Sequence, residues 1–492
     1  MPDTDRSAPI LVWFRDDLRL DDNPALAAAL SQNRPVVAVY VREDGSGAPR
    51  TPGGASRWWL HHSLTRLSES LAKAGVPLVL RHGAAHAILQ DLVAETGASH
   101  ILWNRRYDPS GIAVDTALKA AFRADGVVAE SFSANLLAEP WDVATGSGGP
   151  YRVFSPFFRA LVARGEPAPP RPSALPAEAG PREGTASPDS ETPASLFPLP
   201  TRPDWAGGLR DTWEPGEAGA LRRLSAFLDD GLARYAAQRD EPASQATSML
   251  SPHLRFGEIS PRRIWHAVAH RGADPSSGIG ERQVAKFQSE LGWREFSYHL
   301  LFHFPDLGTA NFQPRFDAFP WRSDEMQLRA WTKGLTGYPL VDAGMRELWH
   351  TGTMHNRVRM VAASFLIKHL MLDWRQGEAW FWDTLVDADP ANNAASWQWV
   401  AGSGADAAPY FRIFNPTTQG EKFDPDGDYT KRWVPELSGL PPKYLFKPHE
   451  APREILAQAG IRLGDTYPRP IVDHSTARQR ALDAFQTIKN AA

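Results

Sequence analysis

Apolar positions follow two different patterns along the chain, and the change of pattern divides it into two parts. From Ile10 to about Leu137, short apolar runs alternate with stretches of helical periodicity, which is typical of a doubly wound parallel sheet. The expected strands and helices come in the order ILVWF, 23–30, VVAVYV, 56–74, VPLVL, 86–95 and HILW. We therefore expect an α/β domain at residues 1–137.

From Pro215 onward, apolar residues recur with helical spacing, as in the segment NRVRMVAASFLIKHLMLDW. We expect an all-α domain at residues 213–492, whose last helix reaches about Gln486. Residues 164–204, between the two parts, contain eleven of the 42 prolines and many Ala, Ser and Gly residues. A segment of this composition buries little apolar surface, so we interpret residues 138–212 as an interdomain linker.

Composition narrows the chemistry that this chain performs. Its 492 residues are 42% apolar and 22% charged, as in globular proteins. The absence of cysteine excludes disulfides, thiolate nucleophiles and cysteine-ligated metals. The formal charge of -4 does not indicate a nucleic-acid partner, so any DNA contact requires a local basic patch.

The N-terminal sequence MPDTDRSAPILVWF lacks the basic and apolar regions of a secretory signal. No apolar run reaches the roughly 20 residues that a membrane helix needs. We therefore expect a cytoplasmic monomer without a membrane partner, associated with the nucleoid when it is bound to DNA.

Two motifs resemble metal sites but lack required residues. His299 and His303 lie one turn apart beside Glu295, without the H-E-x-x-H order of a zinc site. The acidic run from Asp424 to Asp428 lacks the glycine and glutamate of a calcium loop. We expect no metal at either place.

The stretch from Asp387 to Pro416 sets two tryptophans, Trp397 and Trp399, among carboxylates and amides. Indole rings are wide and easily oxidised, and they stack readily on nucleic-acid bases. Asp387, Asp389 and Asn393 are placed to hydrogen-bond a heteroaromatic ring. This combination indicates electron transfer together with base stacking.

Three further segments allow both a functional and a structural interpretation. One helical face carries Glu290, Trp293, Arg294 and Ser297, which suits a flat polar ligand, or else a core tryptophan beside a Glu290 to Arg294 pair.

The helix after Thr353 aligns Asn356 with Met360, beside Arg357 and Arg359, which suits a base and its phosphates, or else a solvated basic face. The hydroxyls and amides of residues 247–252 suit a pyrophosphate, or else an ordinary helix cap.

Together these residues closely resemble the photolyase/cryptochrome family over nearly the whole chain. The matching motifs follow in order: VWFRDDLRLDDNPAL, TSMLSPHLRFGEISP, ELGWREF, TGYPLVDAGMREL, MHNRVRM and LDWRQGE. The resemblance implies an N-terminal α/β domain joined by a long connector to a helical domain that binds FAD. It also implies a light-driven lyase reaction on DNA.

The resemblance assigns three groups of residues. Those implied to bind FAD are Tyr235, Thr247, Ser248, Met249, Leu250, Ser251, Arg294, Arg359, Asp387, Ala388, Asp389 and Asn393. Those implied to re-reduce the flavin by electron transfer are Trp397, Trp374 and Trp321. Those implied to bind DNA and the lesion are Arg239, Glu290, Trp293, Ser297, Asn356, Arg357, Met360, Trp399, Arg412 and Gln419.

The implied reaction repairs cyclobutane pyrimidine dimers. Reduced, anionic FAD absorbs blue light and donates an electron to a flipped-out dimer, the ring splits, and the electron returns. Glu290, Asn356 and Asn393 are the catalytic residues that the resemblance implies. In the (6-4) repair branch, histidines stand in place of Asn356 and Met360, so that chemistry is not expected here.

A second hypothesis is a cryptochrome-like photoreceptor that signals through FAD without repairing DNA. Plant cryptochromes commonly carry Asp at the position of Asn393, and Glu290, Trp293, Met360 and Trp399 match the repair branch, so we favour repair. A flavin-independent DNA-binding protein is a third hypothesis, and it gives the tryptophan chain no purpose.

An antenna chromophore is also implied, with methenyltetrahydrofolate as our first choice and a deazaflavin as the second. The Asn-Glu pair that binds folate in some bacterial relatives is replaced by Ser110-Gly111. Residues 104–109 and the FRDDLR turn mark the expected region.

Overall fold

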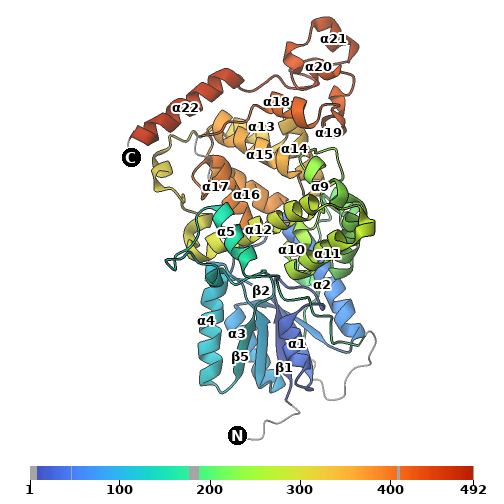
Figure 1. The fold of residues 1–492 in the computed structure, drawn as a ribbon, viewed down its shortest axis with the longest axis vertical. Coiled ribbons are helices and arrows are strands. Elements are labelled where there is room, and N and C mark those ends of the chain that lie inside the picture. The colour runs from blue at the N-terminus through green and yellow to red at the C-terminus, as the bar shows by residue number, and fades with distance from the viewer. Residues whose placement is uncertain (1–7, 46, 177–187, 407–410, 491–492) are drawn as a thin grey trace. The chain divides into compact units, whose positions relative to one another are not determined.

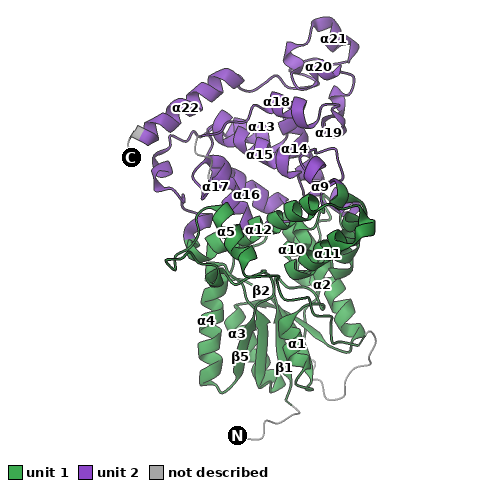
Figure 2. Ribbon diagram, viewed as in Figure 1, with its two compact units in different colours: residues 1–205, 213–233, 248–305 green, residues 206–212, 234–247, 306–492 purple. Residues whose placement is uncertain are grey.

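The computed structural model describes residues 8–45, 47–176, 188–406 and 411–490. Packing divides the chain into two compact units, shown in Figure 2. Unit 1 comprises residues 1–205, 213–233 and 248–305, and unit 2 comprises residues 206–212, 234–247 and 306–492. This division differs from the expected domains, because helices after residue 213 pack with the sheet unit. The domain boundaries themselves stay a prediction, and residues 177–187 of the expected linker lie outside the described residues.

Unit 1 contains a five-stranded parallel sheet in the order β3-β2-β1-β4-β5 (Figure 1). Its strands are β1 (Ile10–Phe14), β2 (Val36–Glu43), β3 (Leu78–Gly83), β4 (His100–Asn104) and β5 (Val128–Phe132). Every residue of β1 is buried, because a central parallel strand has neighbours on both edges and helices on both faces. The α/β fold with a doubly wound sheet is therefore confirmed.

The expected apolar runs coincide with β1 to β4, whereas β5 was not expected. Within the described residues, strand β5 pairs only with β4, and its side chains are intermediate or exposed. An edge strand of this kind lacks the continuous apolar run that marks a buried strand.

Helices flank the sheet and extend unit 1. They are α1 (Pro24–Leu30), α2 (Gly54–Lys73), α3 (Ala85–Thr96), α4 (Pro109–Ala124), α5 (Phe154–Ala163), α6 (Pro193–Leu196), α8 (Glu217–Ala226), α10 (Ser251–Arg255), α11 (Pro261–Ala273) and α12 (Glu281–His303). Helix α5 lies in the expected linker and buries Phe154, Phe157 and Leu161 along one side. This part of the linker is therefore packed structure.

Unit 2 is helical, as expected. Its helices are α7 (Gly207–Thr212), α13 (Glu325–Thr332), α14 (Pro339–Thr351), α15 (Asn356–Ser364), α16 (Trp374–Thr384), α17 (Asn392–Ala401), α18 (Pro416–Phe423), α19 (Asp428–Trp433), α20 (Pro442–Leu445), α21 (Arg453–Gln458) and α22 (His474–Asn490), while α9 (Leu232–Gln238) spans the boundary between the units. A π-helical turn, Phe365–His369, continues α15. Residues 340–401, which include α14 to α17 and the segments between them, supply most of its apolar core. Among the described residues, no helix has the length and apolarity needed to span a membrane.

Candidate functional site

Helix α15 brings together several of the predicted residues in unit 2. Asn356 is exposed at its start, and its amide lies 4.0 Å from the sulfur of Met360 on the same side of the helix. Arg357 forms an ion pair of 2.9 Å with Asp240 and lies over the ring of Phe423. Arg239, beside Asp240, lies over the ring of Tyr235. The structure thus places residues predicted for DNA and for FAD in one neighbourhood.

The start of α15 is held by a partly buried glutamate that was not expected from the sequence. Glu347 of α14 accepts a hydrogen bond of 2.6 Å from the hydroxyl of Tyr429 and one of 3.4 Å from the backbone amide of His355. Burial raises the pKa of Glu347 to about 7. His355 in turn accepts a hydrogen bond from the amide of Arg357. The polar residues of α14 alone do not indicate that Glu347 contacts the start of α15.

The pKa of Glu347 leads to a pH-dependent prediction. A carboxyl whose folded pKa is raised contributes stability below its unfolded pKa of 4.5, and this is lost as pH rises through about 7. The Glu347→Gln variant keeps an oxygen acceptor and has no proton to lose. We expect its Tm, relative to the parent, to rise between pH 5 and pH 8, with a free-energy difference of about 3 kcal/mol.

Thermal unfolding of both proteins across this pH range measures the effect. Subtracting the Tm of the parent removes the contributions of other titrating groups. One such group is Glu295, because burial raises its pKa to about 7 as well. A Tm difference that stays constant with pH would contradict the assignment.

Two polar pairs lie where the resemblance places the flavin ring. The guanidinium of Arg359 donates to both carboxylate oxygens of Asp387, at 3.1 and 2.9 Å. The buried amide nitrogen of Asn393 donates to the carboxylate of Glu378 at 2.8 Å and to its carbonyl at 3.1 Å. These bonds leave the carbonyl oxygen of Asn393 available to accept from a ring N–H. The donors and acceptors present therefore fit a heteroaromatic ring such as that of FAD.

The other predicted FAD residues have more local roles. Asp389 accepts from the amides of Ala391 and Asn392, at 2.9 and 2.7 Å, just before and at the start of α17. Ala388 is buried in the unit 2 core. In unit 1, Met249 has a left-handed backbone with φ of 53°, and the hydroxyl of Ser248 accepts from the amide of Leu250. Ser251 is exposed at the start of α10, while Thr247 and Tyr235 belong to unit 2.

The three tryptophans of the predicted electron chain belong to one apolar cluster of unit 2. Trp397 is 2% exposed and Trp374 is fully buried, and Trp321 is partly buried against the same cluster. A side chain at Gly377 of α16 would meet the ring of Trp397 at 2.1 Å, so this glycine permits the close approach of α16 to α17. Trp321 and Trp374 lie on segments joined by the amide of Arg322, which donates to the carbonyl of Met371 at 2.8 Å. Burial decreases from Trp397 and Trp374 to Trp321.

Trp399 differs from Trp397 although only one residue separates them. Residues two positions apart on an α-helix are rotated by about 200° around the helix axis, so the side chains of Trp397 and Trp399 point in nearly opposite directions. Trp399 is partly exposed, and its indole N–H donates to the carbonyl of Asp406 at 3.1 Å. The structure therefore separates a buried tryptophan from an accessible one.

Two predicted DNA residues lie beyond Trp399. Arg412 is exposed, and its carbonyl accepts a hydrogen bond from the ammonium group of Lys368. Burial lowers the pKa of Lys368 to about 7. The amide oxygen of Gln419 on α18 is buried without a hydrogen-bond partner among the described residues. Such an oxygen is available to a donor from a ligand.

In unit 1, helix α12 carries the remaining predicted residues. Glu290 forms an ion pair of 2.9 Å with Lys286. Arg294 donates to the carbonyl of Asn135 at 2.7 Å. The hydroxyl of Ser297 is buried and donates to the carbonyl of Trp293 within the helix at 3.0 Å. Trp293 stays partly exposed and stacks on Phe154.

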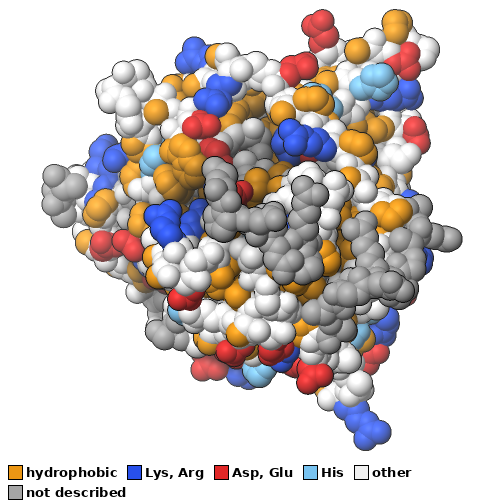
Figure 3. Space-filling model, turned by 90° about the horizontal axis from the view of Figure 1, so that it is seen from below, with side chains coloured by type: hydrophobic (Ala, Val, Ile, Leu, Met, Phe, Trp, Pro, Cys, Tyr) orange, Lys and Arg blue, Asp and Glu red, His pale blue; other side chains and the backbone are white. Residues whose placement is uncertain are grey.

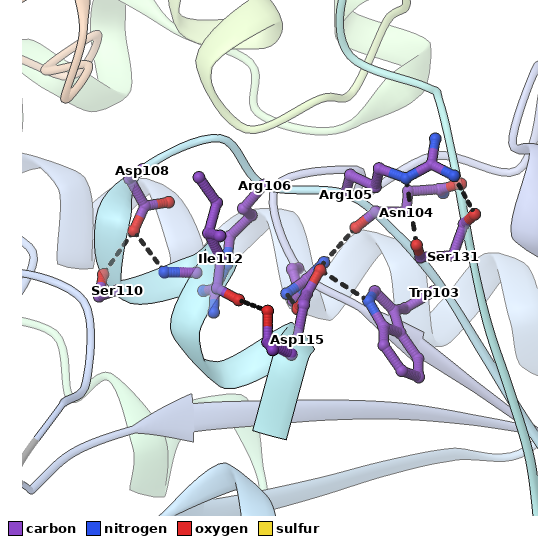
Figure 4. A network of polar contacts seen from close by, with 12 residues as sticks. Trp103, Asn104, Arg105, Arg106, Asp108, Ser110, Ile112, Asp115 and Ser131 are labelled. Carbon is purple, nitrogen blue, oxygen red and sulfur yellow. Dashed lines mark hydrogen bonds and ion pairs between the residues drawn. The ribbon is translucent and has the colours of Figure 1, made fainter. Parts of the chain in front are cut away.

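The region expected for an antenna forms a dense polar network in unit 1 (Figure 4). Arg15 binds Asp115 at 2.6 Å, and Asp115 also accepts from the indole of Trp103 at 2.8 Å. Asp108 caps α4 by accepting from Ser110 and from the amide of Gly111. The Ser110-Gly111 pair is thus part of a helix cap, and the antenna contacts stay a prediction.

Both rejected metal motifs have structural roles. His299 is buried, accepts from the amide of Tyr151 at 3.0 Å, and has a pKa lowered to about 4 by burial. Asp424 accepts from the amides of Tyr429 and Thr430 in a turn. Within the described part of the chain, no cluster of metal ligands occurs. On the face shown in Figure 3, acidic and basic side chains are interspersed.

Comparison with known proteins identifies the family. Residues 10–176 match the family described as DNA photolyase, and residues 287–487 match the FAD binding domain of DNA photolyase. The second match supports FAD as the cofactor. The chain is 58% identical over 488 residues to a deoxyribodipyrimidine photo-lyase of Agrobacterium fabrum, which covers 98% of this chain and 99% of that protein.

Cryptochrome-1 of Arabidopsis thaliana is 40% identical over 483 residues, covering 96% of this chain and 70% of that protein. The crystal structure of a bacterial class III photolyase from Agrobacterium tumefaciens has a TM-score of 0.94 at 56% identity, covering 100% of this chain and 99% of that one. The expected fold and resemblance are therefore confirmed, and the chain belongs to the photolyase/cryptochrome family.

Proposed function

We propose that this protein repairs cyclobutane pyrimidine dimers in DNA by a light-driven reaction. Reduced FAD, when bound and excited by light, supplies an electron to the dimer and takes it back after the ring has split. The proposal agrees with the identity to the Agrobacterium fabrum deoxyribodipyrimidine photo-lyase. The chain's own residues would orient the flavin, receive the lesion and exclude water.

The observation that carries this proposal is the placement of residues on helix α15. Its Arg359 binds Asp387, beside the residues proposed to surround the flavin ring. Its Asn356 and Met360, within one turn of Arg359, are accessible and lie on one side of the helix. One rigid helix would therefore contact both the electron donor and the electron acceptor. This arrangement supports electron transfer from the flavin to DNA.

Each proposed contact follows from the chemistry of its side chain. Asn356 would hydrogen-bond a pyrimidine edge, while Met360 would pack against the ring as a soft apolar group. Trp293 and Trp399, both partly exposed, would stack on the flipped bases. Arg239, Arg357 and Arg412 would bind phosphates, which makes the affinity sensitive to salt.

The remaining residues would control the electron. Glu290 would stabilise the dimer after it accepts the electron. The carbonyl oxygen of Asn393 would accept a hydrogen bond from the flavin ring, since its amide nitrogen is bound to Glu378. Trp397, Trp374 and Trp321 would return the flavin to its reduced state from the surface. We further propose methenyltetrahydrofolate, before a deazaflavin, as an antenna, which chromophore extraction and an absorption spectrum identify.

Illumination of damaged DNA tests the function directly. Protein with chemically reduced FAD is mixed with single- and double-stranded DNA containing cyclobutane dimers, and intact pyrimidines are measured in light and in darkness. We expect restoration only in light. Failure on both substrates under illumination would refute repair and favour the photoreceptor. Restoration on single strands alone would place the protein among the single-strand-selective cryptochromes.

A further inference from the structure

An aromatic stack joins α5 to α12 in unit 1. The ring of Phe154 lies parallel to the indole of Trp293, with 3.8 Å between centroids and 8° between planes. Phe158 of the same helix also stacks on Phe154, at 5.5 Å and 16°. Three aromatic rings from two helices are thus stacked through Phe154.

Close packing of the two helices holds this stack. Gly292, next to Trp293, lies so near Phe158 that an added side-chain carbon would meet its ring at 2.3 Å. Phe154 is itself only 9% exposed. Phe296 meets the indole edge-on, at 6.0 Å and 73°. The rings of Phe154 and Phe296 thus contact the indole of Trp293 from two directions.

The stack leaves Trp293 with one available face. Phe154 covers one face of the indole at van der Waals distance, yet the residue as a whole stays partly exposed. Its accessible surface therefore lies on the opposite face and at the edges. A flat ligand that stacks on Trp293 adds a further layer to an existing aromatic stack.

We propose that Phe154 is a positioning residue that fixes the plane of Trp293 for stacking on a base of the flipped dimer. This inference rests on the proposed repair function and assigns a role to a residue that itself touches no DNA. An indole without a ring behind it would rotate about its side-chain bonds and would have to be ordered when the lesion binds. Ordering one such side chain weakens binding by about three- to tenfold.

Phe157 offers a matched control on the same helix. It is more buried than Phe154, at 2% exposure, and packs on Phe296 and His299, with ring centroids at 5.2 and 5.0 Å. Replacing it with leucine disturbs the same helix interface but not the face of Trp293. Any loss of binding that comes from general destabilisation should therefore be at least as large in Phe157→Leu.

The test measures dissociation constants in darkness for duplex DNA with and without a cyclobutane dimer. Phe154→Leu, and Phe154→Met as a second apolar variant, should weaken dimer binding about three- to tenfold. Binding of undamaged DNA, FAD content and repair of saturating dimer DNA in light should stay at parental values. Phe157→Leu should bind both DNAs as the parent does.

A double-variant cycle shows whether Phe154 acts through Trp293. In a Trp293→Ala background, Phe154→Leu should have no further effect on dimer binding, because the positioned ring is gone. Parental affinity in the Phe154 variants, an equal loss in Phe157→Leu, or an undiminished effect in the Trp293→Ala background would overturn the proposal. A parent that binds both DNAs equally would instead contradict the proposed function.

Discussion

Replacement of Trp397 by phenylalanine is expected to abolish most flavin photoreduction. Phenylalanine is much harder to oxidise than tryptophan, so the electron chain would lose its proposed first donor. Because Trp397 is buried, the smaller phenylalanine also leaves a cavity, which lowers the free energy of unfolding by about 1–3 kcal/mol. The measurement is the loss of oxidised-flavin absorption under blue light with an external reductant, compared with the parent.

Trp331 provides the control for this variant. It is fully buried in the same cluster, lies 6.3 Å from the ring of Trp397, and donates its indole N–H to the carbonyl of Ala362. Trp331→Phe should lose similar stability and keep photoreduction. The Trp397→Phe protein, when its flavin is reduced chemically, should still repair dimers in light, since the tryptophan electron chain serves only to reduce the flavin. Photoreduction at the parental rate in Trp397→Phe would refute the assigned role.

Replacement of Arg359 by methionine is expected to abolish FAD binding and to destabilise unit 2. The carboxylate of Asp387 is only 5% exposed, so loss of its partner leaves a buried charge without compensation. Arg359 keeps 25% of its side chain exposed, which lets solvent screen part of the interaction. We expect a loss of about 2–3 kcal/mol, below the range for fully buried pairs. Thermal unfolding and the flavin-to-protein absorbance ratio measure the two effects.

The double variant Arg359→Met with Asp387→Asn separates folding from cofactor binding. It removes both charges, so most of the lost stability should return. FAD binding should not return, because the proposed ring contacts are still absent. Full recovery of FAD in the double variant would show that the pair has a structural role only.

Much of the fold and of the candidate site follows from local sequence patterns. Strands β1 to β4 are continuous apolar runs because parallel strands are buried on both faces. The spacing of Trp397 and Trp399 already requires opposite helix faces. The sequence motifs, taken in order, identified the family. The hydroxyl, amide and charged residues within them supplied most of the residues expected at the site.

Other features depend on contacts between distant segments. Strand β5 is ordered by pairing with β4, although its own residues are not continuously apolar. Glu347 supports α15 only because Tyr429 and the amide of His355 come to it in the folded chain. The segment around Phe154 was interpreted as linker from the composition of its neighbours, yet it forms α5.

The sequence by itself determined the fold class, the family and the residue types available for electron transfer and stacking, because periodicity and motif chemistry are local properties. Only the tertiary structure decided which indole is buried, which carboxyl supports α15 and which face of Trp293 is covered. Those outcomes depend on how helices distant in sequence approach one another. The 3.8 Å contact between Phe154 and Trp293 is set by such packing, which neither residue's own segment encodes.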